Sequence, residues 1–158
     1  MDSIFNAIKN FLLTEVNDSL SEESSIELTA FDDKRIIFGL VDVSKFQGSK
    51  VIASVLPERQ SLGQGNAADT VLENEILLTV ICGADTFERI QKKTVLYAKA
   101  IESCILQKTQ WPDTIEDVHF ESAEYTFDAG SAPGQLSAVE IRLTVDTEIN
   151  DPVDDLFD

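Results

Sequence analysis

The fold is decided by the stretch Ile76-Leu77-Leu78-Thr79-Val80-Ile81, which is followed closely by Gly83-Ala84-Asp85. A continuous apolar run of this length is typical of a strand buried on both faces, so we expect residues 71–82 to form a central strand. The glycine ends that strand. Asp85, with Glu88 three residues later, predicts a capping box that starts a helix at Thr86. The stretch therefore predicts a central strand followed directly by a helix.

This predicted helix covers residues 86–108 and has two different sides, because successive side chains turn by about 100°. One arc is expected to pack on the sheet, and it consists of Phe87, Ile90, Thr94, Tyr97, Ala98, Ile101 and Ile105. The opposite side carries four cations around Leu96, namely Arg89, Lys92, Lys93 and Lys99. Trp111-Pro112 ends the helix, since proline cannot continue it.

A first amphipathic helix is predicted at residues 3–16, where apolar side chains recur with the period of an α-helix. These side chains are Ile4, Phe5, Ile8, Phe11, Leu12 and Val16. An acidic, serine-rich stretch follows. After it, the alternation of Ile26, Leu28 and Ala30 with polar residues predicts a short strand.

The remaining strands are predicted at residues 35–43, 50–56, 115–127 and 137–149. A turn at 46–49 separates the first two, and Pro57 is expected to stop the second. Residues 58–70 contain two glycines without periodicity and predict a long exposed loop. The strand at 115–127 changes phase at Tyr125, which predicts a bulge, and 130–134 predicts a hairpin connection.

Together these elements predict an α+β fold, a mixed and mostly antiparallel β-sheet packed by two amphipathic helices (3–16 and 86–108). We expect a single α+β domain at residues 1–149, followed by an acidic C-terminal segment at 150–158. A chain of 158 residues is long enough for one domain with a substantial core.

Charge is the dominant feature of the composition. Twelve Lys and Arg stand against 29 Asp and Glu, which gives a net charge of −17. Such a chain repels phosphate backbones and anionic lipids, so nucleic-acid binding by charge is excluded. No window approaches the roughly 20 consecutive apolar residues that span a bilayer, and the N-terminal stretch lacks the features of a secretion signal.

The residues that carry chemistry are few and scattered. His119 is the only histidine, Gly63-Gln64-Gly65 lacks the continuation of a phosphate-binding loop, and Asp151, Asp154 and Asp155 lack the spacing of a calcium loop. Cys82 and Cys104 have no metal-ligand spacing, so we expect free cytoplasmic thiols and leave open a contact between them. We expect no enzyme, no cofactor and no metal site.

Surfaces for protein partners remain. Leu96, within the cations of the second helix, is one apolar candidate, and Leu156 and Phe157, within the acids of residues 151–158, are its complement. This pairing predicts that the acidic segment of one copy docks near the helix of another copy or of a partner. The alternative is that an exposed leucine and a solvated segment have no such role. Arg59 and Leu62, in the predicted loop, are further interface candidates.

Three stretches resemble the tail terminator or tail completion (neck-type) proteins of long-tailed bacteriophages. They are Val51-Ile52-Ala53-Ser54-Val55-Leu56-Pro57, then Ile76-Leu77-Leu78-Thr79-Val80-Ile81 leading into 85–105, and Val139-Glu140-Ile141-Arg142-Leu143-Thr144-Val145. The resemblance covers about residues 1–147 and rests on pattern and spacing. Residues 26–43 and the acidic segment depart from the family's pattern.

The resemblance implies a virion structural protein of the tail or neck, made in the host cytoplasm. It would form a homo-oligomeric ring, commonly a hexamer, that caps the tail tube and joins it to head-neck (connector) proteins during viral tail assembly. DNA would pass through the lumen without specific binding, and no cofactor is implied. Another phage neck or tail-assembly protein fits the same pattern. The charge also leaves open an acidic inhibitor or DNA mimic that binds a basic protein, and a small enzyme is a third alternative.

Overall fold

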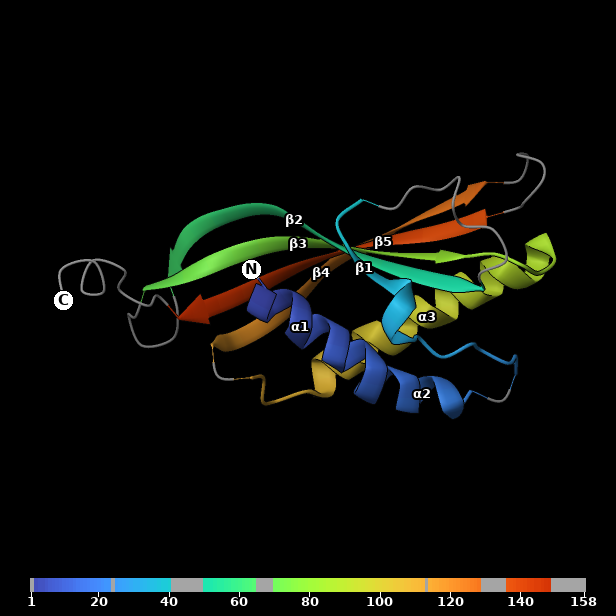
Figure 1. The fold of residues 1–158 in the computed structure, drawn as a ribbon, viewed down its shortest axis with the longest axis horizontal. Helices are drawn as coiled ribbons and strands as arrows, with labels where there is room; N and C mark the ends of the chain where they lie inside the picture. Colours follow the sequence, from blue (N-terminus) through green and yellow to red (C-terminus); the bar gives the residue numbers. More distant parts are fainter. Residues whose placement is uncertain are drawn as a thin grey trace.

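A computed structural model describes residues 2–23, 25–40, 50–64, 70–112, 114–128 and 136–148. Five strands form one sheet in the order β1-β2-β3-β5-β4, and the helices lie together on one of its faces (Figure 1). The strands are β1 Ile36–Phe38, β2 Val51–Gln64, β3 Thr70–Cys82, β4 Ile115–Asp128 and β5 Leu136–Glu148. The predicted α+β fold, with a mixed and mostly antiparallel sheet packed by two amphipathic helices, is confirmed.

Strand β3 is the centre of the sheet, as predicted, and it pairs antiparallel with β2 on one side and β5 on the other. Its side chains that face the helices, such as Ile76, Leu78 and Val80, are fully buried. On the opposite face, Ile81 is buried in a small second cluster with Ile52, whereas Leu77 and Thr79 are only half-buried. The expectation of burial on both faces therefore holds fully for the helix side alone.

The first helix runs from Asp2 to Ser21, five residues beyond the predicted end. It consists of α1 Asp2–Phe11, a π-helical segment η1 Leu12–Val16, and α2 Asn17–Ser21. Leu12, Val16 and Leu20 are buried at intervals of four residues. Four residues turn an α-helix about 40° past a full circle, so this series would drift off the core, and the wider π turn corrects the drift.

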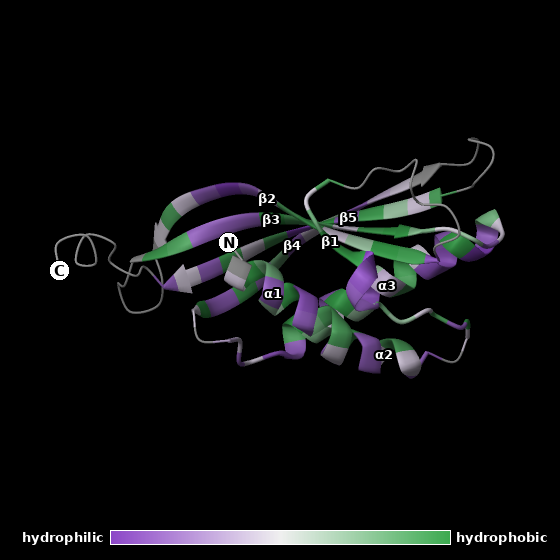
Figure 2. Ribbon diagram, viewed as in Figure 1, coloured by the Kyte–Doolittle hydropathy of each residue, from purple (hydrophilic) through white to green (hydrophobic). Residues whose placement is uncertain are grey.

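Helix α3 Phe87–Gln107 packs on the sheet through the arc predicted from the sequence. Ile90, Thr94, Tyr97, Ala98, Ile101 and Ile105 are all buried, and Phe87 is half-buried. Apolar residues line the space between the sheet and the helices, whereas polar residues gather on the outward sides (Figure 2). Within the described ranges, no helix has the length and apolar character that a membrane span requires.

Strand β2 does not stop at Pro57 but continues to Gln64, which contradicts the predicted loop at 58–70. Its register with β3 shifts between Pro57 and Arg59. Proline lacks an N–H, yet β1 pairs only with Ala53 to Val55 of β2, so no strand in the described part of the chain needs a donor from Pro57 on that edge. Residues 65–69 lie outside the described residues.

No strand forms at residues 26–30, contrary to prediction. Tyr97 of α3 donates its hydroxyl to the carbonyl of Thr29 at 2.6 Å, and Leu28 packs against the main core. The alternation therefore marks an extended segment that is half-buried on the helices. The predicted strand at 35–43 is reduced to Ile36–Phe38 within the described part, while the predicted turns at 46–49 and 130–134 fall outside it.

Strand β5 confirms the predicted alternation, with Val139, Ile141, Leu143 and Val145 buried on the helix side. The bulge predicted in β4 at Tyr125 lies earlier, between Phe120 and Ser122. A change of phase in the alternation of apolar side chains indicates an inserted residue somewhere in the strand. The position of the bulge depends on the register with the neighbouring strand, which the sequence of one strand does not contain.

Candidate interaction site

Asp85 organises the N-terminal end of α3, but not as the predicted capping box. One carboxylate oxygen accepts the backbone N–H of Thr86 at 2.8 Å, and the other accepts from Arg89 Nε at 2.9 Å and Lys93 Nζ at 2.8 Å. Glu88 instead lies 3.8 Å from Lys92. The hydrogen bonds from Lys93 and then Arg89 hold the pKa of Asp85 well below its usual range.

Lys93 is not part of an exposed basic face, which corrects the sequence prediction. Only 8% of its surface is exposed, because it lies next to the buried arc of α3 and reaches back to Asp85. The cations on the outer side of α3 are therefore Arg89, Lys92 and Lys99. The ion pair joins residues that are eight positions apart, and Asp85 lies before the helix begins. The periodicity of the helix therefore does not predict this pair.

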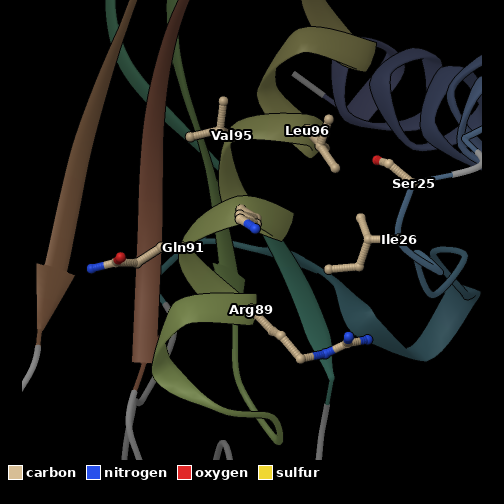
Figure 3. A pocket seen from close by; sticks show the side chains of 7 residues that line it. Ser25, Ile26, Arg89, Gln91, Val95 and Leu96 are labelled. Atoms are coloured by element: carbon tan, nitrogen blue, oxygen red, sulfur yellow. The ribbon is translucent and has the colours of Figure 1, made fainter.

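Leu96, which the sequence predicted to be an apolar spot among the cations of the helix, is half-buried and forms part of a groove. The groove has a volume of about 610 Å³. Ile26 and Leu96 point toward one another across it, with Arg89 beside Ile26 (Figure 3). Val95 and Lys92 also line the groove, so its lining is apolar with two cations. Ile26 was missed because its contact with α3 is tertiary, and the local pattern assigned it to a strand.

The cations of the groove retain donors for a ligand. Lys92 Nζ is separated from Glu88 by 3.8 Å, longer than a hydrogen bond, and its side chain is 67% exposed. Arg89 uses only Nε on Asp85 among the described contacts, although a guanidinium has five N–H donors. Lys99 is exposed and has no ion pair within the described residues. The groove can therefore take an apolar group that is flanked by anions.

The other predicted interface residues do not join this groove. Arg59 and Leu62 are exposed on the distal half of β2, and Arg59 lies 3.7 Å from Glu75 of β3. In Figure 1, that half of β2 lies at the opposite end of the sheet from the N-terminus of α3. Leu156 and Phe157 fall outside the described residues.

The face of the sheet that the helices leave uncovered carries rows of acids. Glu73, Asp146 and Asp117 stand directly opposite one another on β3, β5 and β4, and Glu140 stands opposite Glu124. Like charges in directly opposed positions destabilise a sheet. His119 Nε2 lies 3.3 Å from both Asp117 and Asp146, and Arg142 pairs with Glu58. The lone histidine therefore lies between two acids within this row.

Neither cysteine has the environment of an activated nucleophile. Burial raises the pKa of the Cys82 thiol to about 11, and burial also raises that of Cys104. Both thiols are free, as predicted. Cys82 lies near Thr94, whereas Cys104 contacts the carbonyl of Glu15 about 15 Å further along α3, so the contact left open between them does not form. Among the described residues, no group of His, Cys, Asp and Glu could hold a metal ion.

A search with protein-family models found no match, and neither did a search of curated protein sequences.

Proposed function

We propose that this chain is a virion structural protein of a long-tailed bacteriophage, a subunit of a ring that caps the tail tube and joins it to the head and neck. The proposal rests on the resemblance of three stretches to tail terminator and tail completion proteins. The structural observation that carries it is the two-sided sheet. One face is packed by the helices, and the other is left free of helices and carries rows of acids, apart from a small buried apolar cluster around Ile52 and Ile81.

Such a subunit suits the wall of a channel through which DNA moves. The uncovered face contains Glu73, Glu75, Asp117, Asp146, Glu124 and Glu140, against the cations Arg59 and Arg142. Acids that face a lumen repel phosphates and keep DNA from binding to the wall. This function also explains the rows of opposed acids, which lower the stability of the fold. Proteins commonly retain such destabilising features at functional surfaces.

The mass of the purified protein tests this proposal, measured by light scattering on a size-exclusion column at moderate salt. We expect a hexamer-sized particle, or a monomer that assembles when tail-tube protein is added. Electron microscopy of the mixture should then show rings at tube ends. A monomer that ignores the tube under all these conditions would overturn the proposal.

The acid rows also favour a second candidate function, an acidic inhibitor that occupies the nucleic-acid site of a basic protein. Carboxylates on adjacent strands lie about 5 Å apart, which makes the face a dense anionic surface. A DNA mimic of this kind would inhibit a nuclease or helicase, and added salt would relieve the inhibition. A ring subunit would assemble on tubes and leave such enzymes active.

A further inference from the structure

We propose that the groove on α3 binds the acidic segment, residues 151–158, of a second copy of the chain, so that copies join head to tail. This inference adds a specific subunit contact to the ring proposed above. The number of copies in the ring rests on that proposed function. The contact itself follows from the chemistry of the groove and from the reach of the chain.

The groove and the segment are complementary in both polarity and charge. Ile26, Val95 and Leu96 form an apolar site with the exposed cations Arg89 and Lys92 at its edge. The segment Asp154-Asp155-Leu156-Phe157-Asp158 places two large apolar side chains between carboxylates. Asp85 does not oppose such a ligand strongly, since its charge is neutralised by Arg89 and Lys93. Apolar anchors bound in a pocket with charged residues at its rim are the usual arrangement of a protein interface.

In one chain, the groove and the strand end from which the segment continues lie far apart, which favours a second copy as the source of the segment. The hydroxyls of Thr94, next to the groove, and Ser137 of β5 are hydrogen-bonded at 2.9 Å, so the groove lies near the start of β5. From Ser137 to Glu148, β5 extends about 37 Å at about 3.4 Å per residue. Leu156 follows Glu148 by eight residues and lies at most about 29 Å from it even when fully extended. The groove also lies on the outer side of α3, which adds to the distance. In Figure 1, the end of β5 and the start of α3 are at opposite ends of the molecule.

The occupant is therefore a neighbouring copy, and the contact has a direction. Each chain offers a groove on α3 and a different surface, the acidic segment, to its neighbour, which makes the interface heterologous. Such contacts repeat until the assembly closes as a ring or continues as a filament. The charges also account for association despite the net charge of −17, because the segment meets the outer surface of α3, where cations are concentrated.

The first experiment mixes two defective variants of the full chain and measures mass by light scattering. Lys92→Glu with Leu96→Asp removes the groove, and Leu156→Ser with Phe157→Ser removes the anchor. Each variant alone should be monomeric. An equimolar mixture should form a dimer and no larger species, because one intact groove and one intact segment remain. The matched control is Leu106→Asp, which alters a 73% exposed leucine on the same helix and should leave assembly unchanged. A particle larger than a monomer in either double variant alone, or an equimolar mixture that stays monomeric, would overturn the proposal.

The second experiment does not require a ring to form. It also remains informative if a double variant of the first experiment does not fold. A synthetic peptide of residues 149–158 is titrated into the chain truncated after Ile149, followed by NMR. We expect shifts at Ile26, Val95 and Leu96. The single variant Lys92→Glu should weaken binding by at least about threefold, and Lys34→Glu, with the same change of charge, should not. Absence of shifts at these residues would refute docking while leaving tube binding, the test of the proposed function, intact.

Discussion

Asn17 and Phe31 exchange two hydrogen bonds across the bend that links the first helix to the sheet. The side-chain oxygen of Asn17 accepts the Phe31 N–H at 2.8 Å, and its Nδ2 donates to the Phe31 carbonyl at 2.9 Å. The amide therefore gives the backbone at Phe31 partners that the missing strand would otherwise supply. It also holds the segment that carries Ile26 against the helices, and so it supports one wall of the groove.

Replacing Asn17 with alanine should destabilise the fold by about 1–3 kcal/mol, because the polar groups of a half-buried backbone lose their partner. Urea unfolding followed by circular dichroism measures the loss. Asn10→Ala is the matched control, since Asn10 is exposed on the same helix. Equal effects of the two substitutions would show that the pair contributes nothing specific.

Replacing Tyr97 with phenylalanine should cost about 0.5–1.5 kcal/mol near neutral pH through loss of the hydrogen bond to Thr29. Burial raises the pKa of Tyr97 above its ordinary value. The native state therefore keeps this proton where the unfolded chain, with a pKa of about 10, loses it. Stability should fall as pH rises above about 10, and less steeply in Tyr97→Phe than in the wild type. Identical pH slopes would contradict the assignment.

Asp85→Asn should lower the melting temperature at pH 7, because Lys93 and Arg89 lose their carboxylate. The lowered pKa of Asp85 means that its contribution is present above about pH 4, the unfolded value, and is lost as pH falls below it. The gap between the wild type and the variant should therefore narrow from pH 7 to pH 3. Asp18→Asn, at an exposed position, is the control and should show no such gap.

Cys82 should resist alkylation in the folded protein. Its side chain is fully buried, and a pKa of about 11 leaves very little thiolate at pH 8. Iodoacetamide labelling read by mass spectrometry should modify Cys104 first, since that residue is partly exposed. Cys82 should react only after denaturant is added. Equal labelling of both cysteines in the native state would show that the end of β3 opens readily.

The parts of the fold that the sequence predicts correctly are those determined by residues close together in the chain. The alternation along β5 and the arc of α3 follow from side-chain periodicity, and both are confirmed. The extent of β2 was not predictable, because Pro57 and the glycines after it are local signals for a stop. Pairing with β3 overrides them, and among the described strands none pairs with β2 at Pro57 on its other edge; both facts depend on distant residues.

The candidate site shows the same division. The cations and Leu96 were found because they share one side of a helix. Burial of Lys93 required Asp85, which lies outside that helix, and the groove required Ile26, which is more than sixty residues from Leu96 in sequence. Neither contact follows from a periodic pattern in the sequence, so neither could be predicted from it.

The π segment at Leu12–Val16 has a consequence for how the chain can change in length. A π turn holds one residue more than an α turn in the same rotation, so the first helix carries a tolerated insertion. Loss of an outward residue such as Thr14 would return the helix to α geometry with Val16 and Leu20 still facing the core. Loss of Asn6, in the α-helical part, would instead turn one part of the helix by about 100° relative to the other. The π segment is therefore the place in this helix where one residue can be gained or lost without moving buried side chains out of the core. It lies where the buried side chains recur every fourth residue.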